Sequence, residues 1–336
     1  MENNRKCETM IEISKIKIEN WASVLKIENL ILAEHDYRIA FLLKDIYSQP
    51  FLSNRLCLKG GTAINKLFLK ETSRLSIDLD FNIIGEKEQV FKERKEIKDK
   101  LIEILKRQEM EKIKVKSRYE ELTVSGKYKP LFGETEKIKF EISYLERIPI
   151  LNPIEKKIKI PLGKIKVKTY EIEELLATKI RALYDRLKGR DIYDLYFSSF
   201  IDFDEILLRK LTLLYFYKSG KIFNPKLFFR NIENKFLSEK FIDDVSGFIK
   251  PTAKFSIQTS VKRILESYSF LKEFDERDKK FILLTKKLLG IKLSSKNLKL
   301  IKNIKYPLDF LFSGLEISER ARKTTIEEIK PFKKSD

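Results

Sequence analysis

A diglycine turn between two predicted strands constrains the fold of this chain more than any other part of its sequence. The run 55–58, Arg-Leu-Cys-Leu, is typical of a buried strand. It ends at Lys-Gly-Gly-Thr (59–62), and a short helix is predicted over 63–70. Glycines let the backbone approach a ligand, and N–H groups at a helix start attract negative charge. The sequence therefore predicts a phosphate-binding loop at Gly60, Gly61 and Thr62, although Gly-Gly-Thr alone is also common in ordinary turns.

Two carboxylates follow on the next predicted strand, residues 77–84, which alternates between apolar and polar side chains. Side chains two apart on a strand point to the same face, so Asp78 and Asp80 are expected to project together. Neighbouring carboxylates repel unless a positive charge lies between them. One interpretation is neutralisation by Arg74 or a nearby lysine. The other, favoured here by the diglycine turn upstream, is a magnesium (or manganese) ion that also binds substrate phosphates.

A third carboxylate on another strand could complete such a metal site. Residues 137–145 alternate strongly, and Glu141 lies on the polar face between Lys139 and Ser143. Two-metal phosphoryl transfer needs a carboxylate for the ion that activates the attacking hydroxyl. An ordinary exposed strand glutamate would show the same spacing, and the pattern alone does not separate the two readings.

A helix predicted over 173–188 supplies positive charge. Lys179 and Arg186 lie two turns apart on one stripe and, with Arg190, could bind a triphosphate. Surface helices carry such residues routinely, which is the alternative. Gly189 is predicted to end this helix. The pair Asp191 and Asp194 then has the spacing of a helix-capping box.

The remaining pattern predicts an α+β region over residues 1–198 and a helical region over 199–336. Strand-like segments are expected near 112–128 and near 164–170, joined in part by a proline-punctuated connection. After about residue 200 the strand signals fade. Helices are predicted at 17–31, 34–48 (limited by Pro50), 86–109, 203–218, 225–235, 258–272, 275–289 and 294–314.

Charge and composition narrow the possible functions. The chain carries 69 Lys and Arg against 50 Asp and Glu, a net charge of +19, and residues 279–336 alone hold 15 against 6, a net +9. Such a surface attracts polyanions, nucleic acid above all, although a generally lysine-rich proteome would also raise the charge. His35 is the only histidine, which argues against a histidine-ligated metal or a Ser-His-Asp triad. No apolar run is long enough to cross a membrane, so a soluble, cytoplasmic protein is expected.

Four motifs in this order resemble the AbiEii/AbiGii toxin family, the nucleotidyltransferase-like toxins of type IV toxin–antitoxin and phage-defence systems. The resemblance covers roughly residues 30–200. It implies a polymerase-β-like nucleotidyltransferase core with a mixed sheet, followed by a helical C-terminal domain. The motifs are Lys-Gly-Gly-Thr-Ala-Ile-Asn-Lys (59–66), Arg-Leu-Ser-Ile-Asp-Leu-Asp-Phe (74–81), Glu-Leu-Leu-Ala-Thr-Lys-Ile-Arg-Ala-Leu (174–183) and Arg-Leu-Lys-Gly-Arg-Asp-Ile-Tyr-Asp-Leu (186–195).

The resemblance also implies roles for single residues. Asp78 and Asp80 match the metal-binding pair, and Glu141 is a looser match to a third acidic residue. Lys179 and Asp191 match the catalytic lysine and aspartate of the later motifs. The nucleotide site is expected to involve Gly60, Gly61, Thr62, Arg74, Ser76 and Lys179.

Members of the family bind nucleoside triphosphates and are held in check by an antitoxin encoded beside them. Some attach nucleotides to the 3′ acceptor end of tRNA. The leading hypothesis is therefore nucleotide transfer from a nucleoside triphosphate to RNA, most of all tRNA, with two Mg²⁺ ions. The alternatives are transfer to a protein or small molecule, and an inert module that binds RNA or the antitoxin.

Overall fold

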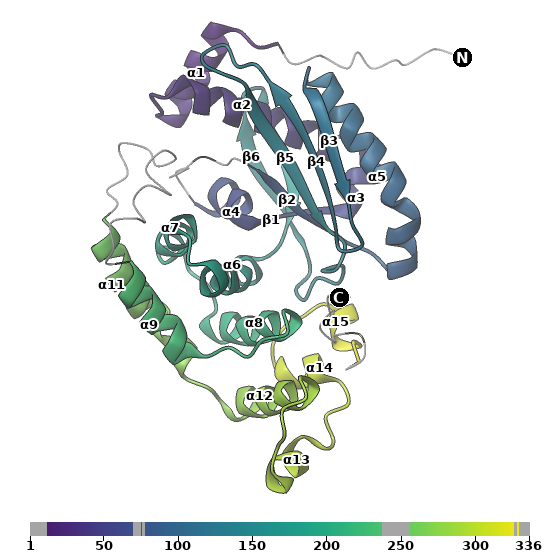
Figure 1. Cartoon of the computed structure of the whole chain (residues 1–336), viewed down its shortest axis with the longest axis vertical. Helices are drawn as coiled ribbons and strands as arrows, with labels where there is room; N and C mark the ends of the chain where they lie inside the picture. Colours follow the sequence, from purple (N-terminus) through teal and green to yellow (C-terminus); the bar gives the residue numbers. More distant parts are fainter. Residues whose placement is uncertain (1–11, 70–74, 76–77, 237–255, 326–327, 329–336) are drawn as a thin grey trace. The chain divides into compact units, whose positions relative to one another are not determined.

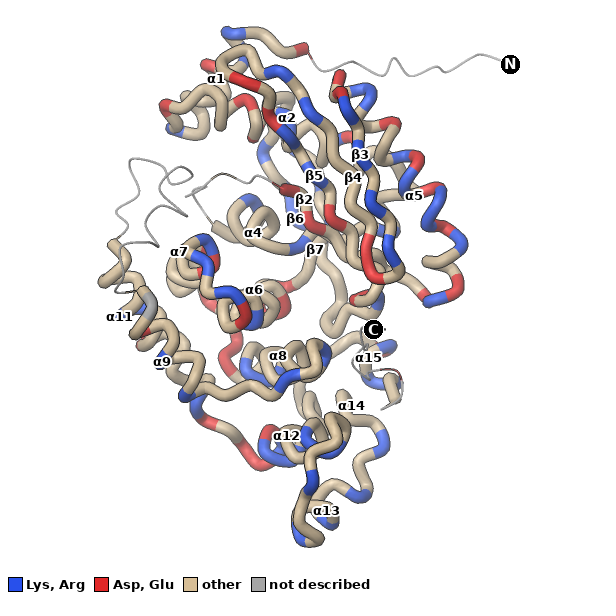
Figure 2. Tube along the Cα trace, in the orientation of Figure 1, with Lys and Arg blue, Asp and Glu red and all other residues tan. Residues whose placement is uncertain are grey.

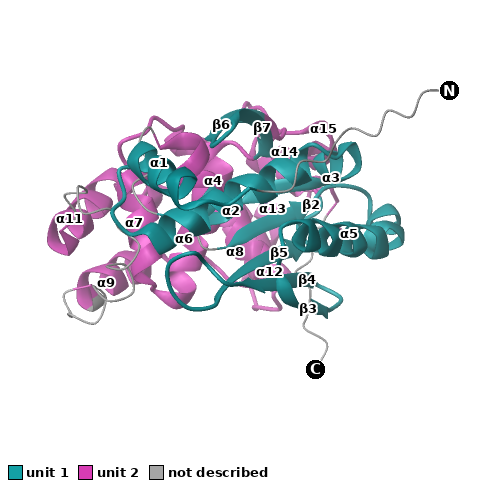
Figure 3. Ribbon diagram, turned by 90° about the horizontal axis from the view of Figure 1, so that it is seen from above, with its two compact units in different colours: residues 1–62, 74–147, 155–169 teal, residues 63–73, 148–154, 170–336 magenta. Residues whose placement is uncertain are grey.

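The computed structural model describes residues 12–69, 75, 78–236, 256–325 and 328, and the chain divides into two compact units (Figure 3). Unit 1 comprises residues 1–62, 74–147 and 155–169, and unit 2 comprises residues 63–73, 148–154 and 170–336. Both units are therefore assembled from segments that are distant in sequence. Residues 170–198, predicted to belong to the first domain, fall in unit 2. As a functional division, the boundary at residue 198 stays a prediction.

A mixed seven-stranded sheet forms the centre of unit 1 (Figure 1). Its strand order is β3-β4-β5-β2-β1-β7-β6, in which β2 is antiparallel to β1 and parallel to β5. The strands are β1 (Leu56–Lys59), β2 (Leu79–Ile83), β3 (Glu111–Ser117), β4 (Glu121–Tyr128), β5 (Glu136–Ser143), β6 (Ile154–Ile160) and β7 (Gly163–Thr169). The predicted α+β class with a mixed sheet is thereby confirmed.

The alternation of apolar and polar side chains gives this sheet two different faces. In β5, the side chains of Ile138, Phe140 and Ile142 are fully buried, whereas Lys139 and Glu141 are only partly buried. Helix α5 (Lys87–Arg107) packs against β3 and β4 and also contacts α2 (Leu30–Tyr47). Because successive side chains on a strand point to opposite faces, Lys139 and Glu141 share the face opposite the buried row.

Two short elements of unit 1 differ from the predictions for physical reasons. Pro50, expected only to limit the preceding helix, is the first residue of α3 (Pro50–Arg55), where its missing N–H is harmless. Strand β6 lies in the connection that was predicted to be irregular, because its prolines flank the strand and do not interrupt it. Helix α1 (Lys15–Leu25) also belongs to this unit.

Unit 2 is helical, and its centre is the packing of α6 (Ile172–Arg186) against α8 (Glu205–Lys218). A buried carboxylate fixes a distant segment to α6, because Glu174 accepts hydrogen bonds from the N–H groups of Ile150 and Leu151 at 3.0 and 2.9 Å. The other elements are η1 (Ile64–Phe68), α7 (Gly189–Ser198), α9 (Pro225–Lys235), α11 (Ile257–Ser267), η3 (Ser269–Lys272), α12 (Glu276–Leu288), α13 (Ser295–Ile301), α14 (Pro307–Leu311) and α15 (Glu319–Arg322). The helical C-terminal region is confirmed.

Two predicted helix boundaries in unit 2 are wrong. Leu187 takes the left-handed conformation that ends α6, so Gly189 starts α7 and does not terminate the preceding helix. The helix predicted over 294–314 is divided into α13 and α14, and Pro307 is the first residue of the second. Within the described ranges, no helix combines the length and apolar character needed to cross a membrane.

Candidate active site

A row of polar residues crosses the sheet of unit 1 at one level. Asp80 in β2 is the register partner of Lys59 in β1 and of Glu141 in β5, and Glu141 pairs in turn with Thr123 in β4. Register partners on adjacent strands point to the same face. The strand pairing thus brings Asp80 and Glu141 together from positions about sixty residues apart in sequence, as the metal-site hypothesis requires.

Lys139 provides the positive charge within this group. Its Nζ lies 2.8 Å from Oε1 of Glu141 and 3.5 Å from Oδ2 of Asp78. Burial by itself lowers the pKa of Lys139, but the carboxylates of Glu141 and Asp78 outweigh it and raise the pKa above its ordinary value. The group is therefore a mixed cluster, in which the ammonium groups of Lys139 and Lys59 lie near the carboxylates of Asp80, Glu141 and Asp78, the residue directly before β2.

The carboxylate of Glu141 is kept ionised by its neighbours. Burial alone raises the pKa of Glu141, but hydrogen bonding and charge from Lys139, a hydrogen-bonding contact with Asp80 and the charge of Lys59 together lower it. A carboxylate with a lowered pKa is available to a cation at neutral pH. Asp80 and Glu141 are register partners, so their carboxyl groups lie next to each other on one face of the sheet.

The donor set fits a hard cation, although it is not a preformed metal cluster. Across the described part of the chain, no three His, Cys, Asp or Glu side chains converge closely enough to hold a metal as they stand. Oxygen donors from carboxylates are nevertheless the ligands that Mg²⁺ prefers. The ammonium of Lys139 already lies between two of the carboxylates as a stand-in cation. This agrees in part with the alternative that a nearby lysine neutralises the pair.

The predicted phosphate loop lies next to the carboxylates in unit 1. Gly60 begins α4 (Gly60–Ala63) with φ +73°, and a Cβ added there would come within 2.6 Å of Oδ2 of Asp80. The buried hydroxyl of Thr62 donates a 2.8 Å hydrogen bond to the main-chain carbonyl of Asp78. The hydrogen bond of Thr62 thus connects the diglycine loop directly to the segment that carries Asp78 and Asp80.

Gly60→Ala is expected to lower activity more than tenfold while destabilising the fold by only about 1 kcal/mol. The added methyl group would push the Asp80 carboxylate out of position, and the left-handed backbone would be mildly strained. Gly290→Ala is the matched control, because Gly290 has φ +79° and nothing lies within 4 Å of its added Cβ. Activity and the free energy of unfolding in urea are measured for both variants. Full activity of Gly60→Ala would contradict the proposed closeness of loop and carboxylate.

The second set of predicted residues forms a buried ion network in unit 2. Nζ of Lys179 lies 3.0 Å from Oδ1 of Asp191 and 2.9 Å from Oδ2 of Asp194. Asp191 also accepts two hydrogen bonds from Arg186, at 2.7 and 2.8 Å. Asn65, from η1, donates to Asp194 at 2.9 Å. Both aspartates and Lys179 are buried.

This network changes the interpretation of the two aspartates. Neither caps α7, whose N-cap is Lys188 without a side-chain hydrogen bond. Burial raises the pKa of Asp191, but the charges and hydrogen bonds of Lys179 and Arg186 together lower it. Asp191 therefore stays ionised and holds both cations. Arg186, predicted to bind phosphate, is half-exposed at 55% and keeps its guanidinium on this carboxylate.

Two predicted site residues lie outside the described part of the chain, and two residues at the site were not predicted. Arg74 and Ser76, predicted to bind nucleotide, lie outside the described residues. Lys139 and Asn65 contact the predicted residues but were missed as functional candidates, because strand register and tertiary packing place them there. A two-residue spacing from Glu141 was the only sequence signal for Lys139, and Asn65 had none beyond its place in the first motif.

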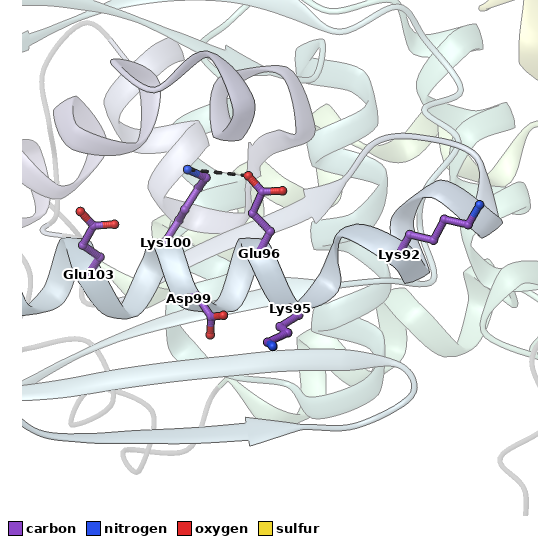
Figure 4. A pocket seen from close by; sticks show the side chains of 6 residues that line it. All are labelled: Lys92, Lys95, Glu96, Asp99, Lys100 and Glu103. Atoms are coloured by element: carbon purple, nitrogen blue, oxygen red, sulfur yellow. Dashed lines mark ion pairs between the residues drawn. The ribbon is translucent and has the colours of Figure 1, made fainter.

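A separate surface hollow lies along α5 and does not belong to this site. Figure 4 shows that it is lined by residues of one helix with charges of both signs, and Glu96 and Lys100 form an ion pair across 3.7 Å. None of its lining residues is among the predicted site residues. An exposed helix surface of mixed charge explains it without a ligand.

The comparisons with known proteins that found a match both found nucleotidyltransferase toxins. The family model for the AbiEii nucleotidyltransferase toxin of type IV toxin–antitoxin systems matches residues 42–267, well over half of the chain. The solved structure of MenT4, a nucleotidyltransferase toxin from Mycobacterium tuberculosis H37Rv, is similar, with a TM-score of 0.62 at 19% identity. The match covers 89% of this chain and 99% of that chain, and it shows a shared fold. No match was found among curated protein sequences.

Proposed function

Because the chain belongs to the AbiEii family of type IV nucleotidyltransferase toxins, we propose that it transfers a nucleotide from a nucleoside triphosphate to RNA, with the 3′ acceptor end of tRNA as the substrate. The observation that carries the proposal is the register of Asp80 with Glu141 beside Asp78. Carboxylates grouped on a sheet beside a diglycine helix start suit phosphoryl transfer. The acceptor hydroxyl would attack the α-phosphorus, lose its proton to water, and displace pyrophosphate.

Asp78, Asp80 and Glu141 would hold Mg²⁺ or Mn²⁺. When bound, the metal would neutralise triphosphate oxygens and lower the pKa of the acceptor hydroxyl. The chain's own contribution is to bring the backbone of these three residues to one part of the sheet: Asp80 and Glu141 through strand pairing, and Asp78 through the hydrogen bond that the Thr62 hydroxyl donates to its carbonyl. The N–H groups at Gly60 and Gly61 would bind phosphate oxygens at the helix start.

From the family's later motifs, Lys179 is proposed as a catalytic residue and Asp191 as a positioning residue. Their geometry in unit 2 supports a division of roles, in which Asp191 orients Lys179 and Arg186 and itself binds no metal. A buried lysine is stabilised by the two aspartates that contact it. The proposed role of Lys179 is therefore that of a fixed positive charge.

The RNA part of the proposal has its support at the C-terminal end of unit 2. Residues 279–308 contain nine lysines and no aspartate or glutamate. Seven of these lysines are exposed. In Figure 2, blue segments lie along α12 and α13 and in the loops beside them. A lysine-rich surface binds a phosphate backbone without regard to sequence. We assign this segment, the 279–308 lysine surface, to RNA binding.

Affinity for tRNA is expected to fall steeply as salt rises, with a slope of about −0.7 to −0.9 in log K against log salt per phosphate contacted. Replacing Lys296 and Lys299 by glutamine is expected to reduce the slope by about 1 to 2 units. The control variant replaces Lys92 and Lys95, which are exposed on α5 among acidic residues. Filter binding at several salt concentrations measures the slopes. An affinity independent of salt would contradict the assignment.

Family membership supports a proposal about a partner and one about location. We propose a cognate antitoxin protein that restrains the enzyme, and a cytoplasmic site of action, where tRNA and nucleoside triphosphates are available. Co-expression with the neighbouring gene and co-purification would test the first of these. Loss of toxicity on co-expression without any effect on transfer by the purified toxin would contradict direct restraint of the enzyme.

The test of the function is a transfer assay with each α-labelled nucleoside triphosphate, Mg²⁺ and total RNA. Label in ribonuclease-sensitive, tRNA-sized material would support the proposal and identify the nucleotide. Label in ribonuclease-resistant protein, or in a small product, would keep the chemistry and overturn the RNA substrate. No label with any nucleotide, from folded protein purified without antitoxin, would favour an inert binding module.

A further inference from the structure

We propose that Lys139 is an internal counter-ion that occupies the cation position between Asp78 and Glu141, and that metal binding must displace its ammonium group. This inference rests on the proposed metal site. It assigns a role to a residue that lies outside the family motifs quoted above. Lys139 would stabilise the neighbouring carboxylates of Asp78 and Glu141 before the metal binds, and it would limit how tightly the metal binds.

The contacts of Lys139 support this placement. One ammonium contacts carboxylate oxygens from two segments, Asp78 before β2 at 3.5 Å and Glu141 in β5 at 2.8 Å. A lysine that served only as a surface ion pair would need one partner. The side chain of Lys139 is 25% exposed and that of Asp78 33%, so the group is partly shielded from water but open to ions.

Competition follows from the charges. Asp78 and Glu141 would repel each other without a cation, and one ammonium or one metal ion can lie between them. A divalent ion has twice the charge of the ammonium group and can be coordinated by both carboxylates, but the two contacts of Lys139 must first break. Removal of the lysine charge should therefore leave the empty site less stable and make the metal bind more tightly. A lysine that acts on the nucleotide phosphates would give neither effect in the absence of nucleotide.

Strand β5 offers a matched control. Lys137 lies two residues before Lys139 on the same face, is exposed, and forms none of the described contacts with Asp78 or Glu141. Lys139→Gln and Lys137→Gln therefore remove the same charge from the same strand face. Lys139→Arg keeps the charge, and Asp80→Ala removes a proposed ligand.

The experiment measures Mn²⁺ binding to the full chain without nucleotide, by electron paramagnetic resonance of unbound Mn²⁺, together with the shift in Tm that Mn²⁺ causes. Lys139→Gln is expected to bind Mn²⁺ roughly tenfold more tightly than the wild type, since the side chains are partly exposed and the effect is screened. Its Tm should be lower without Mn²⁺ and should rise more on addition of Mn²⁺. Lys137→Gln and Lys139→Arg should stay close to the wild type.

The outcomes separate this inference from the proposed function. Mn²⁺ binding that Asp80→Ala abolishes, with equal affinity in wild type and Lys139→Gln, would overturn the counter-ion role and leave the metal site standing. Weaker binding by Lys139→Gln would overturn it as well. If none of the proteins binds Mn²⁺ at this site, both the metal proposal and the counter-ion role are overturned.

Discussion

Asp80→Asn is expected to lower the rate of nucleotide transfer by on the order of 10³-fold, the scale of losing one preorganised electrostatic group in an active site. Asparagine has the same size, so β2 should keep its pairing with β1 and β5. What disappears is the negative charge in the middle of the polar row, between Lys59 and Glu141. Single-turnover transfer with saturating nucleotide measures the change in rate.

Asp99→Asn is the control for this prediction. Asp99 is exposed on α5, where it forms a surface ion pair with Lys98 at 3.5 Å. The same chemical change at that position should leave the transfer rate within about twofold, because exposed pairs contribute little. Unchanged activity in Asp80→Asn, with the control also unchanged, would remove Asp80 from the proposed active site.

Lys179→Met is expected to destabilise the protein by about 3–5 kcal/mol, the cost of leaving buried charge without its partner. Asp194 would keep only Asn65 among the contacts described above, whereas Asp191 would keep both hydrogen bonds from Arg186. Most of the loss should therefore come from Asp194. Urea denaturation measures the free energy of unfolding, and activity is compared per folded molecule.

Three further variants separate a structural role of Lys179 from a catalytic one. Adding Asp194→Asn to Lys179→Met should recover part of the stability, because the unpaired charge is removed. Lys221→Met, which breaks a more exposed pair with Asp185, should cost less than about 1 kcal/mol. A stable double variant that remains inactive would support Lys179 as a catalytic charge. Recovery of activity together with stability would show that its role is structural.

The polar face of the sheet could be predicted well, because alternation alone fixes which side chains share a face. The strand over 77–84 and the strand over 137–145 were both expected; β2 lies within the first range, and β5 begins one residue before the second. The pairing of Asp80 with Glu141 could not be predicted in the same way. Register between strands that are distant in sequence depends on the whole sheet, not on either strand's pattern.

Other parts of the site could not be read from spacing for a related reason. A buried salt-bridge network needs partners from several elements, and Lys179, Asp194 and Asn65 come from α6, α7 and η1. The sequence gives Asp191 and Asp194 the spacing of a capping box, and tertiary contacts override that local signal. Strand β6 was missed because flanking prolines and lysine-rich composition resemble a loop.

The way in which the chain passes between the two units has a consequence for synthesis on the ribosome. Strand β1 pairs with β7, whose residues emerge more than a hundred positions later. In unit 2, Ser318 donates hydrogen bonds to the carbonyls of Pro149 and Ile150, at 2.9 and 2.8 Å. All segments of unit 1 have been made once residue 169 is reached, whereas unit 2 must wait for nearly the entire chain. A translation product that ends before Ser318 could therefore complete unit 1 but would lack these contacts of unit 2.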